Sequence, residues 1–318
     1  MSASDLLITA SPHLGGGDTT PRIMWSVVAS LVPIVLAATW FFGLSVPLVL
    51  AAALAGAGAA EWAFGRPGSL ADGSGVITGL LLGLTLPAGL PLWMAFIGGA
   101  FSIGIGKLIF GGLGQNVFNP ALLGRAFLMA TYPVLTTTWA EPRTVEKALD
   151  AVTAATPLAL AKFEGKVDFN LLDMLIGNTA GSLGETSAIA IILGGLYLRY
   201  KGYINWKLPL GYLGTIAAFS AIFWLANPAK YPNPLFHLLA GGAMLGAWFM
   251  VTDMVTSPTT SLGQWIFVIC AGIMAVVIRL FGGLPEGVMY SILFMNAFVP
   301  LLNKHTRPRV FGARRAIE

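Results

Sequence analysis

Long runs of apolar residues, broken by few charges, restrict the folding of this chain more than any other feature. Residues 208–226 and 264–281 are two such runs, and each is long enough to cross the hydrocarbon core of a bilayer as a helix. Only 10% of the 318 residues are charged, compared with roughly 25% in soluble domains. The runs are continuous rather than alternating, which indicates helices rather than a β-barrel. The sequence therefore predicts an all-α integral membrane protein surrounded by lipid.

Turn residues and charges divide the apolar sequence into about ten predicted spans. They are residues 23–42, 47–64, 76–91, 92–110, 115–131, 187–198, 208–226, 235–251, 264–281 and 287–303. Several spans are shorter than the roughly 20 residues of a straight crossing, and prolines such as Pro87 and Pro258 interrupt the pattern. Broken or re-entrant helices are therefore expected.

The positions of the basic residues predict the orientation. Five of the 18 basic residues lie in the last fifteen positions, and basic residues accumulate on the cytoplasmic side of a membrane protein. This places both termini in the cytoplasm of a multi-pass inner (cytoplasmic) membrane protein, and we expect no nucleic-acid partner. The predicted parts are a cytoplasmic N-terminal tail (1–22), a first membrane repeat (23–131), an outer loop (132–186), a second membrane repeat (187–303) and a basic cytoplasmic tail (304–318).

The two membrane regions resemble each other in sequence. Residues 85–127 align with residues 256–298 without a gap, with twelve identities in forty-three positions. The shared residues include a Thr-x-Pro and the block FGGL, which composition alone does not explain. Five spans in each half would invert the second copy relative to the first. Inverted repeats with broken helices place binding sites near the middle of the bilayer.

Polar residues inside or beside apolar spans are costly in lipid and are therefore candidates for function. Asn116 and Asn119 are three residues apart, and their amides can donate and accept hydrogen bonds to a neutral polar ring. The alternative is that they only join helices by hydrogen bonds. Asp253 precedes the helix-breaking Pro258, where it can either cap a half-helix or contact a ligand or cation.

Glu185 and Thr186 form a further candidate, just before the sixth predicted span on the outer side. Ser182 and Glu185 also have the spacing of a capping box, so an ordinary helix start is the alternative.

No paired nucleophile and base and no phosphate-binding loop is visible in the sequence, which argues against a hydrolase or an ATPase. With Cys270 as its one cysteine, the chain cannot build an iron–sulfur cluster by itself.

The outer loop contains the short run LDAVTAATPLA at residues 149–159. Asp150 is followed by Thr153, and Ala155 leads into Thr156, so that small residues surround a hydroxyl that an enzyme can modify. The alternative for these residues is a turn started by the aspartate or a threonine-rich helix cap.

This run resembles a flavinylation motif, D-x-x-[S/T]-x-A-T, in which a flavin transferase links FMN through its phosphate to the final threonine, here Thr156. The chain as a whole is similar to the family of the D subunit of the Rnf complex and the B subunit of the sodium-pumping NADH:quinone reductase. The segments that carry the similarity are SPH at 11–13, TGLLLGLTLP at 78–87, NVFNPALLGRAF at 116–127, GSLGETSAIAIILGG at 181–195 and VTDMVTSP at 251–258.

The resemblance implies a membrane subunit of an ion-translocating ferredoxin:NAD oxidoreductase that passes electrons through covalent FMN on Thr156. It places Asp150, Thr153, Ala155, Glu185 and Thr186 around the FMN. We assign Asn116, Asn119 and Asp253 to a second, non-covalent flavin, riboflavin-like in the related reductase. The implied partners are iron–sulfur and flavin subunits, which connect the chain indirectly to ferredoxin and NAD(H), and the flavin transferase. Na+ or H+ is the transported ion.

Two other functions stay open at this point. A channel or transporter for a small solute also suits inverted repeats with broken helices, and the family fold resembles urea channels. A structural scaffold for catalytic partners is the other alternative. The flavinylation run favours the redox function, because neither a channel nor a scaffold needs it.

Overall fold

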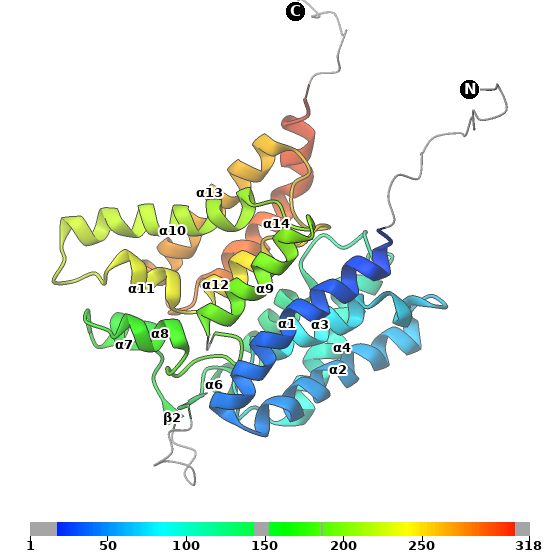
Figure 1. Cartoon of the computed structure of the whole chain (residues 1–318), viewed down its shortest axis with the longest axis horizontal. Coiled ribbons are helices and arrows are strands. Elements are labelled where there is room, and N and C mark those ends of the chain that lie inside the picture. Colours follow the sequence, from blue (N-terminus) through cyan, green and yellow to red (C-terminus); the bar gives the residue numbers. More distant parts are fainter. Residues whose placement is uncertain (1–17, 143–152, 186, 309–318) are drawn as a thin grey trace, which may run out of the picture.

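The protein is mostly helical (Figure 1). The computed structural model describes residues 18–142, 153–185 and 187–308. Two candidate cofactor residues, Asp150 and Thr186, lie outside these described residues. Within these described residues, four helices are both long and apolar enough to cross a membrane: α1 (Thr20–Phe42), α2 (Ser45–Phe64), α10 (Lys207–Ala226) and α13 (Ser261–Phe281). These properties make the chain a mainly α-helical membrane protein.

The first half of the chain forms helices at the five ranges expected from the sequence. α1 has 23 residues and α2 has 20, whereas α3 and α5 have only 11 and 12 and are too short to span a bilayer of about 30 Å. The elements are α1 (Thr20–Phe42), α2 (Ser45–Phe64), the short turn η2 (Ser69–Asp72), α3 (Ser74–Leu84), α4 (Leu92–Ile103), the π-helical turn η3 (Gly104–Leu108) and α5 (Pro120–Thr131).

The second half also forms helices at each of its five expected ranges, and one of these helices is broken. The break divides the expected span 235–251 into three pieces, the last of which is π-helical. The elements are α9 (Ala188–Tyr200), α10 (Lys207–Ala226), α11 (Pro234–Leu239), α12 (Ala243–Leu245), η4 (Gly246–Met250), α13 (Ser261–Phe281) and α14 (Val288–His305).

Short elements connect the two halves. They are α6 (Pro133–Thr136), β1 (Trp139–Ala140), β2 (Thr153–Ala154), α7 (Pro157–Phe163) and α8 (Leu171–Ile176). β1 and β2 form an antiparallel ribbon in which Trp139 pairs with Ala154, a small β element that the all-α expectation did not include. In Figure 1 this connection lies at the lower end of the molecule, away from the start of α1 and the end of α14.

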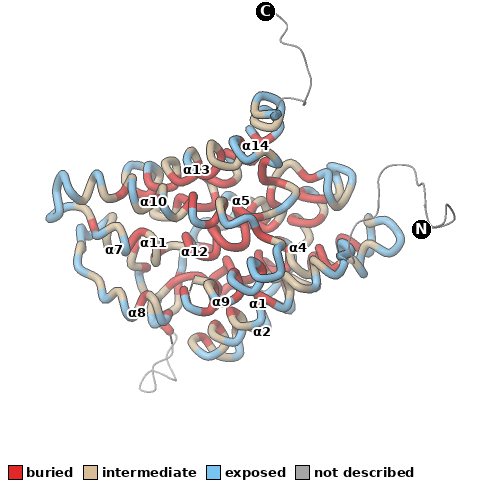
Figure 2. Tube along the Cα trace, turned by 45° about the horizontal axis from the view of Figure 1, so that its top comes forward, coloured by how far each residue is buried: buried red, intermediate tan, exposed pale blue. Residues whose placement is uncertain are grey.

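Corresponding helices of the two halves pack in a similar way. α2 lies along α4, and α10 lies along α13. The α2–α4 contact is close because Gly56 and Gly99 allow the two backbones to approach, where a Cβ on either glycine would overlap the opposite chain segment. Figure 2 shows that the buried residues gather in the centre, where α5 and α12 lie. The core is therefore shared by both halves.

A buried ion pair joins the two halves beside a helix end. Arg125 on α5 pairs with Glu286, which precedes α14, and also donates to the carbonyl oxygen of Thr85 at the end of α3. The side chains of the pair are only 8% and 12% exposed. Arg125 therefore satisfies a backbone carbonyl where α3 ends inside the protein, and its charge is balanced from the other half.

Arg125→Gln is expected to lower the free energy of unfolding by about 3–5 kcal/mol, because it leaves the Glu286 carboxylate buried without its partner. Thermal unfolding of the detergent-purified subunit measures the effect. The exposed Arg199 supplies the control, Arg199→Gln, which should change the stability by less than about 0.5 kcal/mol. Equal losses in the two variants would contradict the role given to the pair.

Candidate cofactor sites

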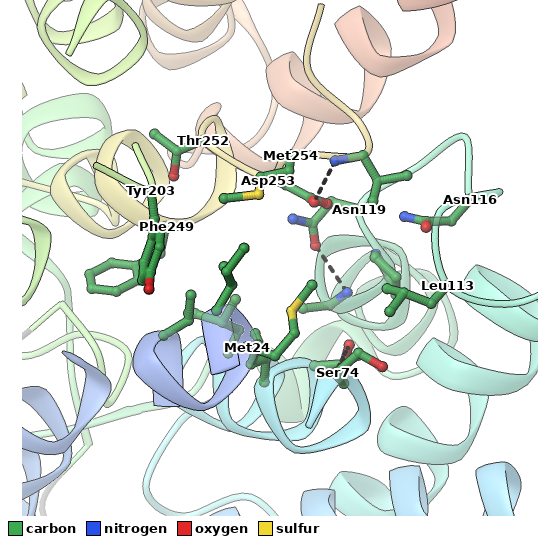
Figure 3. Close-up of a pocket in the computed structure, with 18 of the residues that line it drawn as sticks. Met24, Ser74, Leu113, Asn116, Asn119, Tyr203, Phe249, Thr252, Asp253 and Met254 are labelled. Carbon is green, nitrogen blue, oxygen red and sulfur yellow. Dashed lines mark hydrogen bonds between the residues drawn. The ribbon is translucent and has the colours of Figure 1, made fainter. Parts of the chain in front are cut away.

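A pocket between the two halves brings together the three residues assigned to a second flavin. Asn116, Asn119 and Asp253 all line it, and Figure 3 shows the latter two on the same side, with Phe249 and Tyr203 on another. The pocket encloses about 840 Å³, part of it continuous with solvent. Small-molecule sites have volumes of roughly 300–1,000 Å³. The size and mixed polarity therefore suit a planar polar ring.

The three polar residues also stabilise the chain locally. Asn119 caps α5, and its Oδ1 accepts from the backbone nitrogens of Ala121 and Leu122 at 3.1 and 3.3 Å. Asn116 Nδ2 donates to the carbonyl of Phe118 at 3.2 Å. Each amide keeps further hydrogen-bonding capacity, because an asparagine offers two donors and a carbonyl acceptor. Asn116 and Asn119 can therefore stabilise the chain locally and also bind a ligand in the pocket.

Asp253 closes a turn rather than capping a helix. Its carboxylate accepts from the backbone nitrogen of Val255 at 3.1 Å and from the hydroxyl of Thr256 at 3.0 Å. The cap of α13 is Thr260, whose Oγ1 accepts from Gly263 N. The turn holds the Asp253 side chain beside the pocket.

Two π-helical turns flank the pocket, one from each half. Lys107 on η3 and Trp248 on η4 both line it. Single π-helical turns are rare and often occur at functional sites. The indole Nε1 of Trp248 is buried and has no hydrogen-bond partner among the described residues. A ligand carbonyl in the pocket would supply the acceptor that this donor lacks.

An ionic network at the pocket wall was not predicted from the sequence. Lys107 is buried, pairs with Glu61 on α2 and donates to Ser74 Oγ at 2.6 Å. Asp72 lies 3.8 Å from the same ammonium group. The sequence feature that could have predicted this network is Glu61, because an acidic residue within the apolar run of α2 needs a partner.

Asn296 on α14 is a second residue that sequence reasoning missed. It is fully buried, and with its amide oriented to suit its neighbours it donates to Thr256 O and accepts from Asn119 N at 3.0 Å. Thr256 in turn holds Asp253. Asn296 therefore fixes the segments that carry both polar walls of the pocket.

The structure describes the run LDAVTAATPLA from Thr153 onward, and Thr156 lies at the start of α7, outside this pocket. Thr156 is only 5% exposed, and its hydroxyl oxygen accepts from Ala159 N at 3.1 Å as the helix cap. The helix-cap alternative is therefore correct as a description of the structure. Ala155 is exposed, and the backbone of Thr153 pairs with Ala140. A pocket of about 930 Å³ begins beside Ala155 and Pro157.

Glu185 lies in the connection before α9 and is not part of a helix start. Its carboxylate accepts from Ser182 N at 3.3 Å, which is half of a capping box, but α9 begins only after Ser187, which caps it. Burial, with Glu286 as a second cause, raises the pKa of Glu185 to about 7. Glu185 lies in a small cavity with Arg125 and Glu286.

Comparison with known proteins identifies relatives that match nearly the whole chain. Residues 7–312 match the NQR2, RnfD, RnfE family. One relative, the D subunit of the proton-translocating ferredoxin:NAD(+) oxidoreductase complex of Clostridium ljungdahlii, is 43% identical over 97% of this chain and 96% of its own length. The D subunit of the Na(+)-translocating ferredoxin:NAD(+) oxidoreductase complex of Acetobacterium woodii is 41% identical over 98% and 97%. The D subunit of the ion-translocating oxidoreductase complex of Stutzerimonas stutzeri is 40% identical over 93% of each chain.

Asn296→Leu is expected to destabilise the subunit by about 1–3 kcal/mol for each buried group left without a partner. Thermal unfolding in detergent tests this, with Asn303→Leu on the same helix as the control. Asn303 Oδ1 accepts a hydrogen bond from Thr259 N at an exposed position. Losing this hydrogen bond should lower the free energy of unfolding much less. If Asn303→Leu proved as damaging as Asn296→Leu, Asn296 would not hold the pocket walls.

Proposed function

The chain belongs to the NQR2, RnfD, RnfE family, and from this premise we propose that it passes electrons through FMN bound covalently to Thr156. As a member of this family it is a subunit of an ion-translocating ferredoxin:NAD(+) oxidoreductase complex and is not catalytic alone. The observation that carries the proposal is the run from Asp150 to Thr156, which ends in a modifiable hydroxyl.

The residues around Thr156 fit a flavin phosphate ester. The exposed Ala155 leaves room on one side of the threonine, and a pocket adjoins it. In the attachment step the Thr156 oxygen displaces a leaving group from the phosphorus of the flavin donor, and the hydroxyl proton goes with that group. A flavin transferase is the partner for this step. Bound FMN supplies the redox chemistry, while the protein positions it and sets its potential.

A second, non-covalent flavin, riboflavin-like, is proposed for the pocket between the halves. Asn116, Asn119 and Asp253 offer hydrogen bonds to the polar edge of an isoalloxazine ring, and Phe249 offers an apolar face. The unpartnered Trp248 Nε1, buried among the described residues, supports a ligand with an acceptor atom. The role of these residues is to bind and orient the ring and to keep water from it.

The proposed architecture is two inverted repeats of five spans. One pair of contacts supports it: Arg125 donates to Thr85 O, and Asn296 donates to Thr256 O. Each residue of the second pair stands 171 positions after its counterpart, so the same pair of positions makes a contact between a side chain and a backbone carbonyl in both halves. This correspondence is stronger support than sequence identity, because it repeats a physical interaction and not only a residue type.

The proposed orientation places Thr156 on the outer side and both termini in the cytoplasm. The pocket is lined by Met24 at the start of α1, whereas the connection with β2 lies at the opposite end in Figure 1. The two flavins would then occupy opposite halves of the membrane. Electrons reach and leave them through iron–sulfur and flavin subunits, and the complex moves Na+ or H+.

Thr156→Ala is expected to abolish covalent flavin, because it removes the only atom to which the phosphate is attached. The test is in-gel fluorescence of the denatured subunit after co-expression with a flavin transferase. Thr156→Ser keeps an oxygen at this position and should remain fluorescent. A dark wild-type band, with the transferase active on a control substrate, would refute the redox proposal and favour a channel.

Asn116→Leu combined with Asn119→Asp is expected to reduce the non-covalent flavin of the purified subunit at least severalfold. Aspartate retains the oxygen that caps α5 but lacks the amide donors. Flavin released by denaturation and measured per mole of protein is the readout. Gln115→Leu, at a neighbouring exposed position, should leave it unchanged. An unaltered flavin content in the double variant would remove these residues from the site.

A further inference from the structure

Five charged side chains gather where α7 meets the end of α13. Arg125 pairs with Glu286, and Lys162 on α7 donates to Leu284 O at 2.9 Å, two residues before Glu286. Arg279 on α13 donates to Gly241 O at 3.1 Å, and Gly241 lines the same small cavity as Glu185 and Glu286. Three cations and two carboxylates leave the group with a formal charge of +1. The raised pKa of Glu185 makes the group more positive still as Glu185 takes up a proton.

Arg279 is the cation of this group that is least well balanced. It is 2% exposed, and no carboxylate of the described residues lies within ion-pair distance of it. Its Nη1 donates to His237 O at 2.5 Å, and its Nη2 donates to Ala240 O at 2.7 Å. A buried guanidinium that has only carbonyl partners is costly unless an anion compensates its charge.

Two buried polar atoms at this place have no hydrogen-bond partner among the described residues. They are Nε of Arg279 and Nδ1 of His237. Buried polar atoms are nearly always paired, so each exception requires an explanation. Here two such atoms belong to residues in contact, and one of them is part of a guanidinium with no carboxylate beside it. This combination indicates that an anionic group binds there.

The flavinylated threonine of the proposed function is close to this position. Thr156 starts α7, and two residues later Leu158 packs against Gly241, where an added Cβ would overlap Leu158 and lie 3.1 Å from Arg279 Nη2. Six residues after Thr156, Lys162 donates to Ile278 O, next to Arg279, at 3.2 Å. The helix that begins at Thr156 is thus docked beside Arg279.

We propose that Arg279, assisted by Lys162, supplies the positive charge that holds the phosphodiester between FMN and Thr156. The inference rests on the proposed function, since it requires covalent FMN at that threonine. A phosphodiester carries one negative charge, which cancels the formal charge of the five side chains. Arg279 keeps its Nε–H for this role, because its Nη1 and Nη2 groups donate to backbone carbonyls, and a charge-assisted hydrogen bond to a phosphate oxygen is strong. Arg279 is a positioning residue and takes no part in electron transfer.

The competing explanation is that Arg279 only closes the end of α11. Its donors reach the carbonyls of His237, Ala240 and Gly241, which the break before α12 leaves without helical partners. A purely structural arginine would stabilise the subunit equally with and without FMN. An arginine that holds the phosphodiester would stabilise the flavinylated subunit more. The two explanations therefore differ in the coupling between Arg279 and the flavin.

The experiment measures that coupling by thermal unfolding of the full-length subunit in detergent. Wild type and Arg279→Gln are each expressed with and without a flavin transferase, and mass spectrometry confirms the modification. Flavinylation is expected to raise the melting temperature of wild type by roughly 2–4 °C and to give no increase, or a decrease, in Arg279→Gln. Lys207→Gln is the control, because Lys207 donates to Ser261 Oγ at the opposite end of α13. It should retain the wild-type increase.

A second variant keeps the test valid if Arg279→Gln fails to fold. Lys162→Gln removes a half-buried cation and should reduce the increase by a smaller amount. An increase of wild-type size in both variants, or in Lys162→Gln when Arg279→Gln does not fold, would overturn the inference while leaving covalent FMN intact. A wild-type protein without FMN would instead overturn the proposed function, and the inference with it.

Discussion

Backbone carbonyls at helix ends inside the membrane must find donors within the protein, and much of this structure depends on that constraint. α3 and α11 both end in the interior, and buried arginines close them: Arg125 donates to Thr85 O, and Arg279 donates to carbonyls in and directly after the last turn of α11. Each arginine brings a charge that needs balancing. Glu286 balances the first. The breaks in the helices therefore explain why charged side chains lie in the core of so apolar a chain.

The same breaks create the pocket. Where α3 and η4 stop short of a full crossing, loops from both halves enter the interior, and the segment from Thr252 to Val255 lines the pocket together with the capped start of α5. Asn296 connects the two by its bonds to Thr256 and Asn119. A continuous pair of helices would bury these positions against each other. The interrupted helices instead leave polar side chains facing a shared space.

Hydropathy predicted the helices well because apolar length is a local property of the sequence, and the structure has helices at every expected range. The gathering of Asn116, Asn119 and Asp253 was predicted on the assumption that both halves meet at one site, and they do line one pocket. Asn296, Arg279 and the Glu61–Lys107 pair were missed. Their roles depend on contacts between residues distant in sequence, 46 positions apart for Glu61 and Lys107, and spacing along the chain gives no measure of such contacts.

The locations of the two candidate sites support the proposed passage of electrons across the membrane. The pocket lies beside the start of α1 and is built by both halves, whereas Thr156 lies in the connection between the halves, which Figure 1 shows at the other end of the molecule. The group of charges around Arg279 and Glu286 lies next to the Thr156 helix and reaches α5 through Arg125. Asn119 caps the start of that same helix, α5. α5 is therefore the element that physically links the two sites: its first turn forms the pocket wall and its middle joins the charges near Thr156.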